Sequence, residues 1–332
     1  MNQITNQTKL LLRNCNWENP QSLEELGYIY FGPLLFNYFA WLKFEITNCD
    51  IILFNAREGL FLQEIYELFR EHYNLPQSKY FKTSRKLSTI ASLKTADDVY
   101  HTFKLHRYNG KLSNLLKDRF GIIPNIKNDV NIDTDIQIPN LDLYLDDILQ
   151  NSRRVRTEYK KYVKTIVGDY KNIVMIDSGY QGTTQHNIEK TYGLKFKGRY
   201  MVYKKNSLLD DVRGFYDFER GFFAKNIIFF ESVFTDNIGS YVDIINGEFI
   251  NEPNTENQKY FEDKIQIVNG IKKFIIQMLE TNVDISETFN NIPDIIFDLM
   301  CTNGYIKNEL LFNTFYHDNT FTRDVTKKIN RK

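Results

Sequence analysis

The stretch from Asn172 to Gln185 reads NIVMIDSGYQGTTQ and decides the fold class. Residues 173–176 are apolar, which is typical of a buried strand in a parallel sheet. Asp177 ends this strand, and a turn rich in Gly, Ser and Thr then leads into a helix. At the carboxyl edge of an α/β sheet, such a helix start is suited to bind an anion. We therefore expect a phosphate-binding turn after Asp177, although a capped helix without a ligand fits the same spacing.

Two other predicted strands also end in charged residues. The segment DIILFN at 50–55 is followed by AREG at 56–59, and KYFKTS at 79–84 is followed by Arg85 and Lys86. Strands that alternate with helices from about residue 50 predict a parallel sheet, which resumes at 172–177 and 197–203. The carboxyl ends of parallel strands meet at one edge, so these segments can form one anion site. The alternative is that each cation is an ordinary surface residue.

The same patterns predict the domain organisation. Residues 1–240 are expected to form one α/β domain with a helical insertion at about 87–168. Residues 241–332 are expected to form a mostly helical extension packed on the same domain. Within it, Asn246-Gly247 predicts the turn of a hairpin over 241–250.

The composition narrows the class of protein. The 42 basic and 42 acidic side chains cancel, which disfavours a nucleic-acid-binding protein. Three cysteines that are far apart in the sequence disfavour a disulfide framework or a zinc site. Sequence motifs typical of nucleotide-triphosphate loops, dinucleotide folds, zincins and serine hydrolases are missing. No secretory signal is evident, so we expect a cytoplasmic protein.

The aromatic segment at 27–43 is too short and too interrupted to span a bilayer. We expect it to form a buried helix. A peripheral contact with the inner face of the cell membrane through its aromatic side chains is left open.

Taken in order, these segments resemble a type I phosphoribosyltransferase. The resemblance is closer to a family of capsule and O-antigen polysaccharide loci, in which such a domain is often fused to a haloacid-dehalogenase-type (HAD-type) phosphatase. The segments that carry it are Gly32-Pro33, Arg57-Glu58-Gly59, Ser84-Arg85 and Asp177 to Gln185. It implies transfer of ribofuranose 5-phosphate from phosphoribosyl pyrophosphate (PRPP) to a lipid-linked surface glycan, with Mg²⁺ as cofactor.

The resemblance also implies roles for individual residues. Catalytic roles fall to Asp177, Glu58 and Glu231, and no protein ligand is assigned to the metal. The pyrophosphate is expected to contact Arg57, Gly59, Arg85 and Lys86. The ribose 5-phosphate is expected to contact Ser178, Gly179, Tyr180, Gln181, Gly182, Thr183 and Thr184.

The chain departs from the family pattern in two places. Ser178 stands where the family has a second acidic residue, and the turn before Gly182 is shorter. The phosphatase motif is missing, so a separate HAD-type phosphatase is the expected partner. The sequence does not rank Glu58, Glu231 and Asp236 as the general base that would activate the acceptor hydroxyl.

Three other functions fit parts of the sequence. A nucleobase-salvage phosphoribosyltransferase would need a flat aromatic pocket for the base. A non-catalytic protein that senses PRPP would need a basic face, for which residues 152–161 are the only candidate. A HAD-like sugar phosphatase is disfavoured, because Asp133-Thr-Asp135 lies in a polar stretch that predicts a loop.

Overall fold

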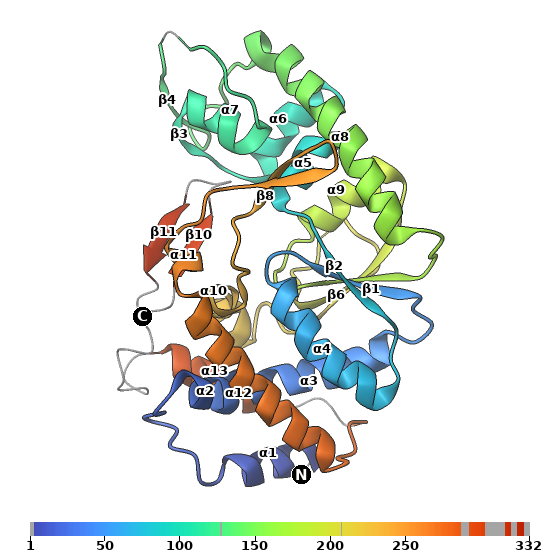
Figure 1. Cartoon of the computed structure of the whole chain (residues 1–332). Helices are drawn as coiled ribbons and strands as arrows, with labels where there is room; N and C mark the ends of the chain where they lie inside the picture. Colours follow the sequence, from blue (N-terminus) through green and yellow to red (C-terminus); the bar gives the residue numbers. More distant parts are fainter. Residues whose placement is uncertain are drawn as a thin grey trace.

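The computed structural model describes residues 3–126, 128–206, 208–286, 292–302, 316–319 and 324–328. A five-stranded parallel sheet lies at its centre (Figure 1). In spatial order the strands are β2 (Ser78–Phe81), β1 (Ile51–Asn55), β5 (Ile173–Asp177), β6 (Phe196–Val202) and β7 (Val212–Tyr216). The predicted α/β class with a parallel sheet is confirmed, whereas the edge strand β7 was not predicted.

Both faces of the sheet are covered, which explains the continuous apolar runs of its central strands. Ile52 and Phe54 of β1 face a core formed with α3 (Gly32–Glu45), α4 (Gly59–Tyr73) and α10 (Phe222–Phe234). Ile51 and Leu53 face the opposite core, formed with α5 (Arg85–Ser92), α8 (Leu145–Val167) and α9 (Thr183–Tyr192). We call these the lower and upper layers, after their places in Figure 1.

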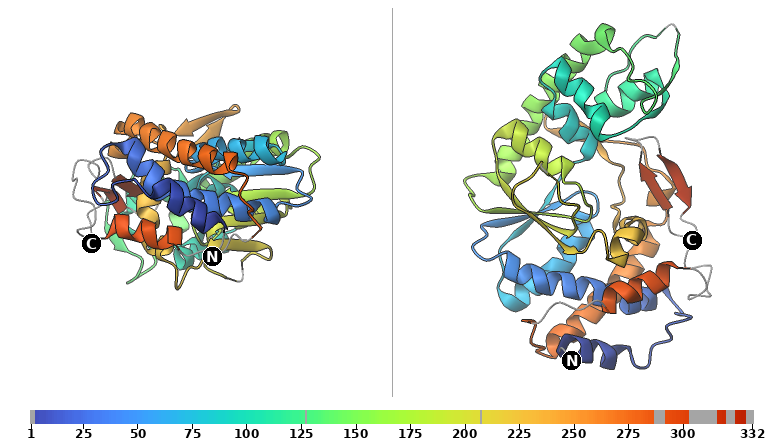
Figure 2. Two further views of the ribbon diagram at one scale, coloured as in Figure 1. Left: turned by 90° about the horizontal axis from the view of Figure 1, so that it is seen from below. Right: turned by 180° about the vertical axis from the view of Figure 1, so that it is seen from behind.

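The lower layer joins segments from both halves of the chain. It contains α1 (Gln3–Leu12), α2 (Leu23–Leu26), the π-helical turn η1 (Gly27–Phe31), α12 (Phe261–Glu280) and α13 (Ile292–Cys301). Ring contacts link η1 to both C-terminal helices, for example Tyr28 to Phe274 and Phe31 to Phe297. The seen-from-below view in Figure 2 shows α12 lying across the N-terminal helices.

The aromatic segment at 27–43 is buried, as predicted, but it begins as a π-helical turn and continues as α3. Phe31, Phe36 and Phe39 are almost fully buried. These aromatic rings therefore belong to the core. Among the described residues, no helix combines the length and apolar character that crossing a membrane requires.

The predicted insertion rises above the sheet between β2 and β5 (Figure 2, right). It contains α5, α6 (Ala96–Leu105), α7 (Leu112–Phe120), the 3₁₀ helix η2 (Asp142–Tyr144) and α8. A short antiparallel pair, β3 (Asn109–Lys111) and β4 (Asn131–Asp133), was not predicted. The insertion has a hydrophobic core of its own, which includes Val99, Leu116, Phe120 and Ile148.

Residues beyond 240 contact both layers. The predicted hairpin is present as β8 (Tyr241–Ile245) and β9 (Glu248–Asn251), and Asn246 and Gly247 take positive φ in its turn. It packs on α5 and α8, whereas α12 packs in the lower layer. The remaining elements are α11 (Glu256–Lys259) and an antiparallel pair, β10 (Tyr316–Asn319) and β11 (Asp324–Lys328). Residues 287–291, 303–315, 320–323 and 329–332 of the predicted extension lie outside the described residues.

Candidate active site at the carboxyl edge of the sheet

The strands β2, β1 and β5 are neighbours, and their carboxyl ends lie at one edge of the sheet. The helices that follow β1 and β5 pack on opposite faces. Phe61 of α4 belongs to the lower layer, whereas Ile188 of α9 belongs to the upper layer. In open α/β sheets, ligands bind where the loops after neighbouring strands diverge in this way. In this chain that point lies between Asn55 and Asp177.

Asp177 is held by two hydrogen bonds. Asn55 Nδ2 donates to Asp177 Oδ2 at 3.0 Å, and the backbone N–H of Gly179 donates to Oδ1 at 3.2 Å. The pKa of Asp177 is raised to about 6, mainly by burial and in part by Glu58, while the hydrogen bonds from Asn55 and Gly179 and the charge of Arg85 oppose the rise. Asp177 is thus an acid whose charge is only partly compensated, which is a feature of functional sites.

Glu231 of α10 belongs to the same group of charges. Its pKa is raised to about 8, mainly by burial and in part by the carboxylates of Glu58 and Asp177. The position that a Cβ on Gly179 would occupy is 3.3 Å from Glu231 Oε1, so this carboxylate lies against the turn after β5. A helix from a distant part of the chain therefore brings a third acid to the sheet edge.

Two arginines act electrostatically on these acids. Arg85 lowers the pKa of both Asp177 and Glu231, and Arg57 lowers that of Glu231. Arg57 follows a cis peptide bond after Ala56, and its backbone N–H donates to Glu58 Oε2 at 3.2 Å. Arg85 is exposed at the start of α5. Hence the structure brings together five predicted site residues, namely Glu58, Asp177, Glu231, Arg57 and Arg85, which we call the charged cluster.

Lys86 does not join the charged cluster. It is buried, and its Nζ lies 3.8 Å from Glu252 Oε1, just beyond β9. Burial lowers its pKa, with the nearby charges coming from the hairpin and from α7 rather than from Asp177 or Glu58. The expectation of two adjacent cations at one anion is therefore wrong in geometry, because successive residues of a helix point about 100° apart.

The turn after Asp177 is held by the loop that follows β6. Lys204 N donates to the Tyr180 carbonyl at 2.8 Å, and Asn206 Nδ2 donates to the Gln181 carbonyl at 2.9 Å. Gly182 caps α9 with φ of 70°, a left-handed conformation that favours glycine.

The residues of this turn that are expected to contact the ribose 5-phosphate differ in their exposure to solvent. Ser178, Gly182 and Thr183 are buried, Gly179 and Thr184 are partly buried, and Tyr180 and Gln181 are exposed. The hydroxyl of Ser178 is therefore covered in this structure. Tyr180 and Gln181 are thus the exposed part of the turn, whereas the start of α9 is largely covered.

Gly59 opens α4 directly after the charged loop. A Cβ at this position would lie 2.6 Å from the carbonyl carbon of Phe54, which is closer than real Cβ contacts. The glycine therefore allows α4 to start tightly against the end of β1. This packing places Arg57 and Glu58 at the sheet edge.

The third candidate base, Asp236, already has a partner. It is 5% exposed, and its Oδ2 accepts a hydrogen bond from the Tyr80 hydroxyl at 2.7 Å. Tyr80 and Asn55 are polar residues of this edge that the sequence reasoning missed. Asn55 could have been found, because a polar residue after the apolar run 51–54 marks a strand end.

A protein-built metal cage is not present among the described residues, since no group of three His, Cys, Asp or Glu side chains is close enough to hold an ion. Mg²⁺ in phosphate-transfer sites takes most of its ligands from substrate phosphates and water. A magnesium ion would therefore have to arrive with a diphosphate.

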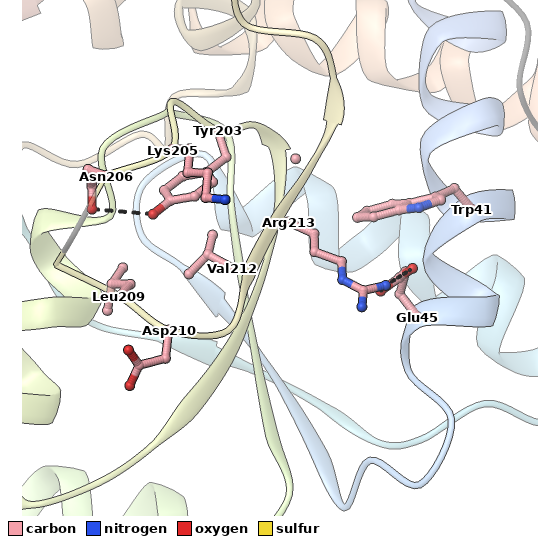
Figure 3. Close-up of a pocket in the computed structure, with 10 residues that line it drawn as sticks. Trp41, Glu45, Tyr203, Lys205, Asn206, Leu209, Asp210, Val212 and Arg213 are labelled. Atoms are coloured by element: carbon pink, nitrogen blue, oxygen red, sulfur yellow. Dashed lines mark hydrogen bonds and ion pairs between the residues drawn. The ribbon is translucent and has the colours of Figure 1, made fainter.

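A cavity of about 540 Å³ lies elsewhere, around the edge strand β7. Figure 3 shows Trp41 and Glu45 of α3 beside Arg213 of β7, with Tyr203 and Asn206 in the loop after β6. None of the predicted site residues lines it. It borders the turn after Asp177 through the loop at 203–206 and through Leu209, whose side chain lies against the position that a Cβ on Gly182 would occupy.

Comparison with known proteins gives no independent guide to the family, because neither a family model nor a curated protein matches the chain.

Proposed function

We propose that the protein is a phosphoribosyltransferase that moves ribofuranose 5-phosphate from PRPP to a sugar hydroxyl of a bacterial surface glycan, releasing pyrophosphate. The observation that carries the proposal is the charged cluster, which lies beside the glycine turn at the start of α9. Such a donor has a diphosphate at one end, a phosphate at the other and a sugar between them that becomes positive during transfer. The cluster and the turn offer a group suited to each part.

The diphosphate would bind Arg57 and Arg85. Guanidinium groups donate paired hydrogen bonds to phosphate oxygens and neutralise the charge of a leaving pyrophosphate. As the bond from C1 to the diphosphate oxygen breaks, both bonding electrons leave with the pyrophosphate. Arginines placed beforehand stabilise that charge without rearrangement.

The 5-phosphate would bind the turn after Asp177. The N-terminus of α9 presents backbone N–H groups and the positive end of the helix dipole. Gly182 has the positive φ that allows the chain to turn into α9 at this point. The family roles of Gly179, Tyr180, Gln181, Gly182, Thr183 and Thr184 fit this arrangement, whereas Ser178 would act through its backbone.

The ribose ring would then lie near Asp177. An ionised carboxylate there offsets the positive charge that develops at C1, and it can accept a hydrogen bond from a ribose hydroxyl. Because the pKa of Asp177 is about 6, the carboxylate is mostly ionised at neutral pH. Its family role therefore requires no change of protonation during the reaction.

The acceptor hydroxyl needs a base, for which Glu58 and Glu231 are the remaining candidates, since Asp236 is bonded to Tyr80. Glu231 lies against Gly179, on the turn beside the ribose position. With a pKa of about 8, it accepts a proton only at mildly alkaline pH. If Glu231 is the base, turnover rises as pH increases through about 8, and Glu231→Gln removes this limb of the profile.

The proposed acceptor is a lipid-linked glycan at the inner face of the cell membrane, with the enzyme in the cytoplasm. Transfer leaves a phosphate on the product. A separate HAD-type phosphatase is therefore the proposed partner. Bound Mg²⁺ would neutralise part of the diphosphate charge.

The test mixes purified protein, Mg²⁺ and PRPP with a panel of synthetic glycan acceptors. Pyrophosphate release that depends on a sugar acceptor, together with a product heavier by one ribose phosphate in mass spectrometry, would support the proposal. Turnover with free nucleobases and none with sugars would favour salvage instead. Binding of PRPP without turnover would favour a sensor, and phosphate release from sugar phosphates would favour a phosphatase.

A further inference from the structure

Asn55 is the last residue of β1, next to the strand that ends in Asp177. The two residues are 122 positions apart in the sequence, and a 3.0 Å hydrogen bond from Asn55 Nδ2 to Asp177 Oδ2 links them. Asn55 is 4% exposed. A short amide at the end of a buried strand has few rotamers available, so it holds its donor in a fixed direction.

The other polar atom of this amide shows that the contact with Asp177 sets its orientation. Among the described residues, Asn55 Oδ1 is buried and has no hydrogen-bond partner. A buried acceptor without a donor destabilises the fold, and an apolar side chain of similar shape would avoid that cost. Only the atom that faces Asp177 is bonded, which points to a role at the site rather than in folding.

We infer that Asn55 is a positioning residue, whose amide N–H fixes the orientation of the Asp177 carboxylate and favours its charged form. The inference rests on the proposed function in one respect, because Asp177 is there the carboxylate beside the ribose. It adds to that proposal a side-chain partner for Asp177, in a chain that has Ser178 where the family has a second acidic residue.

Other titratable and charged groups around Asp177 come from several elements. Glu58 acts from the loop after β1, Arg85 from the start of α5 and Glu231 from α10. Tyr38 of α3 and Tyr200 of β6 also interact electrostatically with its carboxylate. Within the described part of the chain, the hydrogen bonds to Asp177 come from Asn55 and from the backbone of Gly179. Asn55 is therefore the side-chain donor that a substitution can remove.

The experiment follows the Asp177 carboxyl directly. Protein labelled with ¹³C at aspartate carboxyls is titrated by NMR, and the Asp177 signal is assigned by its loss in Asp177→Asn. In Asn55→Leu we expect the midpoint of this signal to move upward by about one pH unit, because the donor that favours the charged form is gone. An unchanged midpoint would overturn the inference.

Asn37→Leu is the matched control. Asn37 is a buried asparagine of α3 whose Oδ1 also lacks a partner within the described residues, and the hydrogen bonds to Asp177 in that part of the chain come from Asn55 and Gly179. Its substitution should leave the Asp177 midpoint unchanged. An equal shift in both variants would indicate a general effect of packing and would overturn the inference. If Asn55→Leu does not fold, Asn55→Ser replaces it, since the serine hydroxyl is too short to reach Asp177, and the same upward shift is expected.

PRPP affinity separates the inference from the function on which it rests. In wild-type protein, affinity is expected to increase as pH rises through about 6. In Asn55→Leu the same rise should occur at higher pH, with binding about twofold weaker near pH 7 and about tenfold weaker at pH 5. A wild-type protein that does not bind PRPP would contradict the proposed function, while the NMR comparison would still decide the role of Asn55.

Discussion

The charged cluster and the basic stretch at 152–161 in α8 are both rich in charged side chains, but they differ in how far those charges are paired. In α8, Arg154 and Arg156 both have structural partners. Arg154 bonds both carboxylate oxygens of Asp243, and Arg156 Nη1 donates to the Leu93 carbonyl at 2.6 Å. In the charged cluster, three acids crowd together and two of them keep raised pKa values.

The comparison shows that a run of charges in sequence says little until its partners are known. The basic stretch has the stronger charge pattern, yet Arg154 joins α8 to the hairpin and Arg156 joins it to the end of α5. Because these arginines are paired within the protein, fewer cations of α8 are available for the basic face that a nucleic-acid-binding sensor would need. The charged cluster comes from separate segments of the sequence. It places acids close together so that two of them have raised pKa values, which is a feature of functional sites.

The largest expected effect is on turnover in Asp177→Asn. Removal of the charge next to the proposed sugar should lower the rate of acceptor-dependent pyrophosphate release about 100-fold or more. Asp243→Asn, which removes the partner of Arg154, should leave the rate unchanged. Equal rates in Asp177→Asn and wild-type protein would refute the assigned role of Asp177.

The next effect is on donor binding in Arg85→Gln. Loss of one charge-assisted contact should weaken PRPP affinity about tenfold and reduce its dependence on salt. Lys86→Gln is the matched control from the adjacent position, since Lys86 pairs with Glu252, and it should not change affinity. Isothermal titration calorimetry at two salt concentrations measures both. A larger loss in Lys86→Gln than in Arg85→Gln would contradict the placement of these side chains.

Glu231→Gln should change stability in a pH-dependent way. The pKa of Glu231 is about 8 in the folded protein against an ordinary value of 4.5, so its contribution to stability is lost as pH rises between these values. At pH 9 the glutamine variant should be more stable, on the order of 1 to 2 kcal/mol after allowance for screening and coupling. At pH 4, where glutamate is protonated in both states, little difference is expected. Urea unfolding at both pH values tests this, and an equal effect at both would be evidence against a buried charge.

The smallest effect is expected in the basic stretch itself. Arg154→Gln removes an ion pair whose side chains are partly exposed, so the free energy of unfolding should fall by about 1 kcal/mol or less. PRPP affinity should stay the same. A marked loss of affinity would mean that α8 contributes to the site after all.

Much of the fold follows from local patterns. The strands β1 and β5 are buried on both faces, so their apolar runs are readable without knowledge of their neighbours. The hairpin turn is readable because Asn246 and Gly247 both accept positive φ. The edge strand β7 is different, because Val212, Arg213 and Gly214 do not form an apolar run and the strand is defined by its pairing with β6.

The candidate site was predicted where strand ends alone determine it. Arg57, Glu58, Arg85 and Asp177 meet because parallel strands share an edge. The role of Asn55 could not be predicted, because it depends on which strand lies beside β5 and on a side-chain contact across 122 positions. The direction of Lys86 depends on how α5 is rotated about its axis, which the sequence near residue 86 does not fix.

The insertion that separates β1 and β5 in the sequence has a consequence for folding. Pairing of these two strands closes a long chain segment, and closure of long loops is slow. Because the insertion has its own core of residues such as Leu116 and Phe120, it can become compact from local contacts first. It would then bring β5 close to β1, so the site should be among the last parts of the molecule to form.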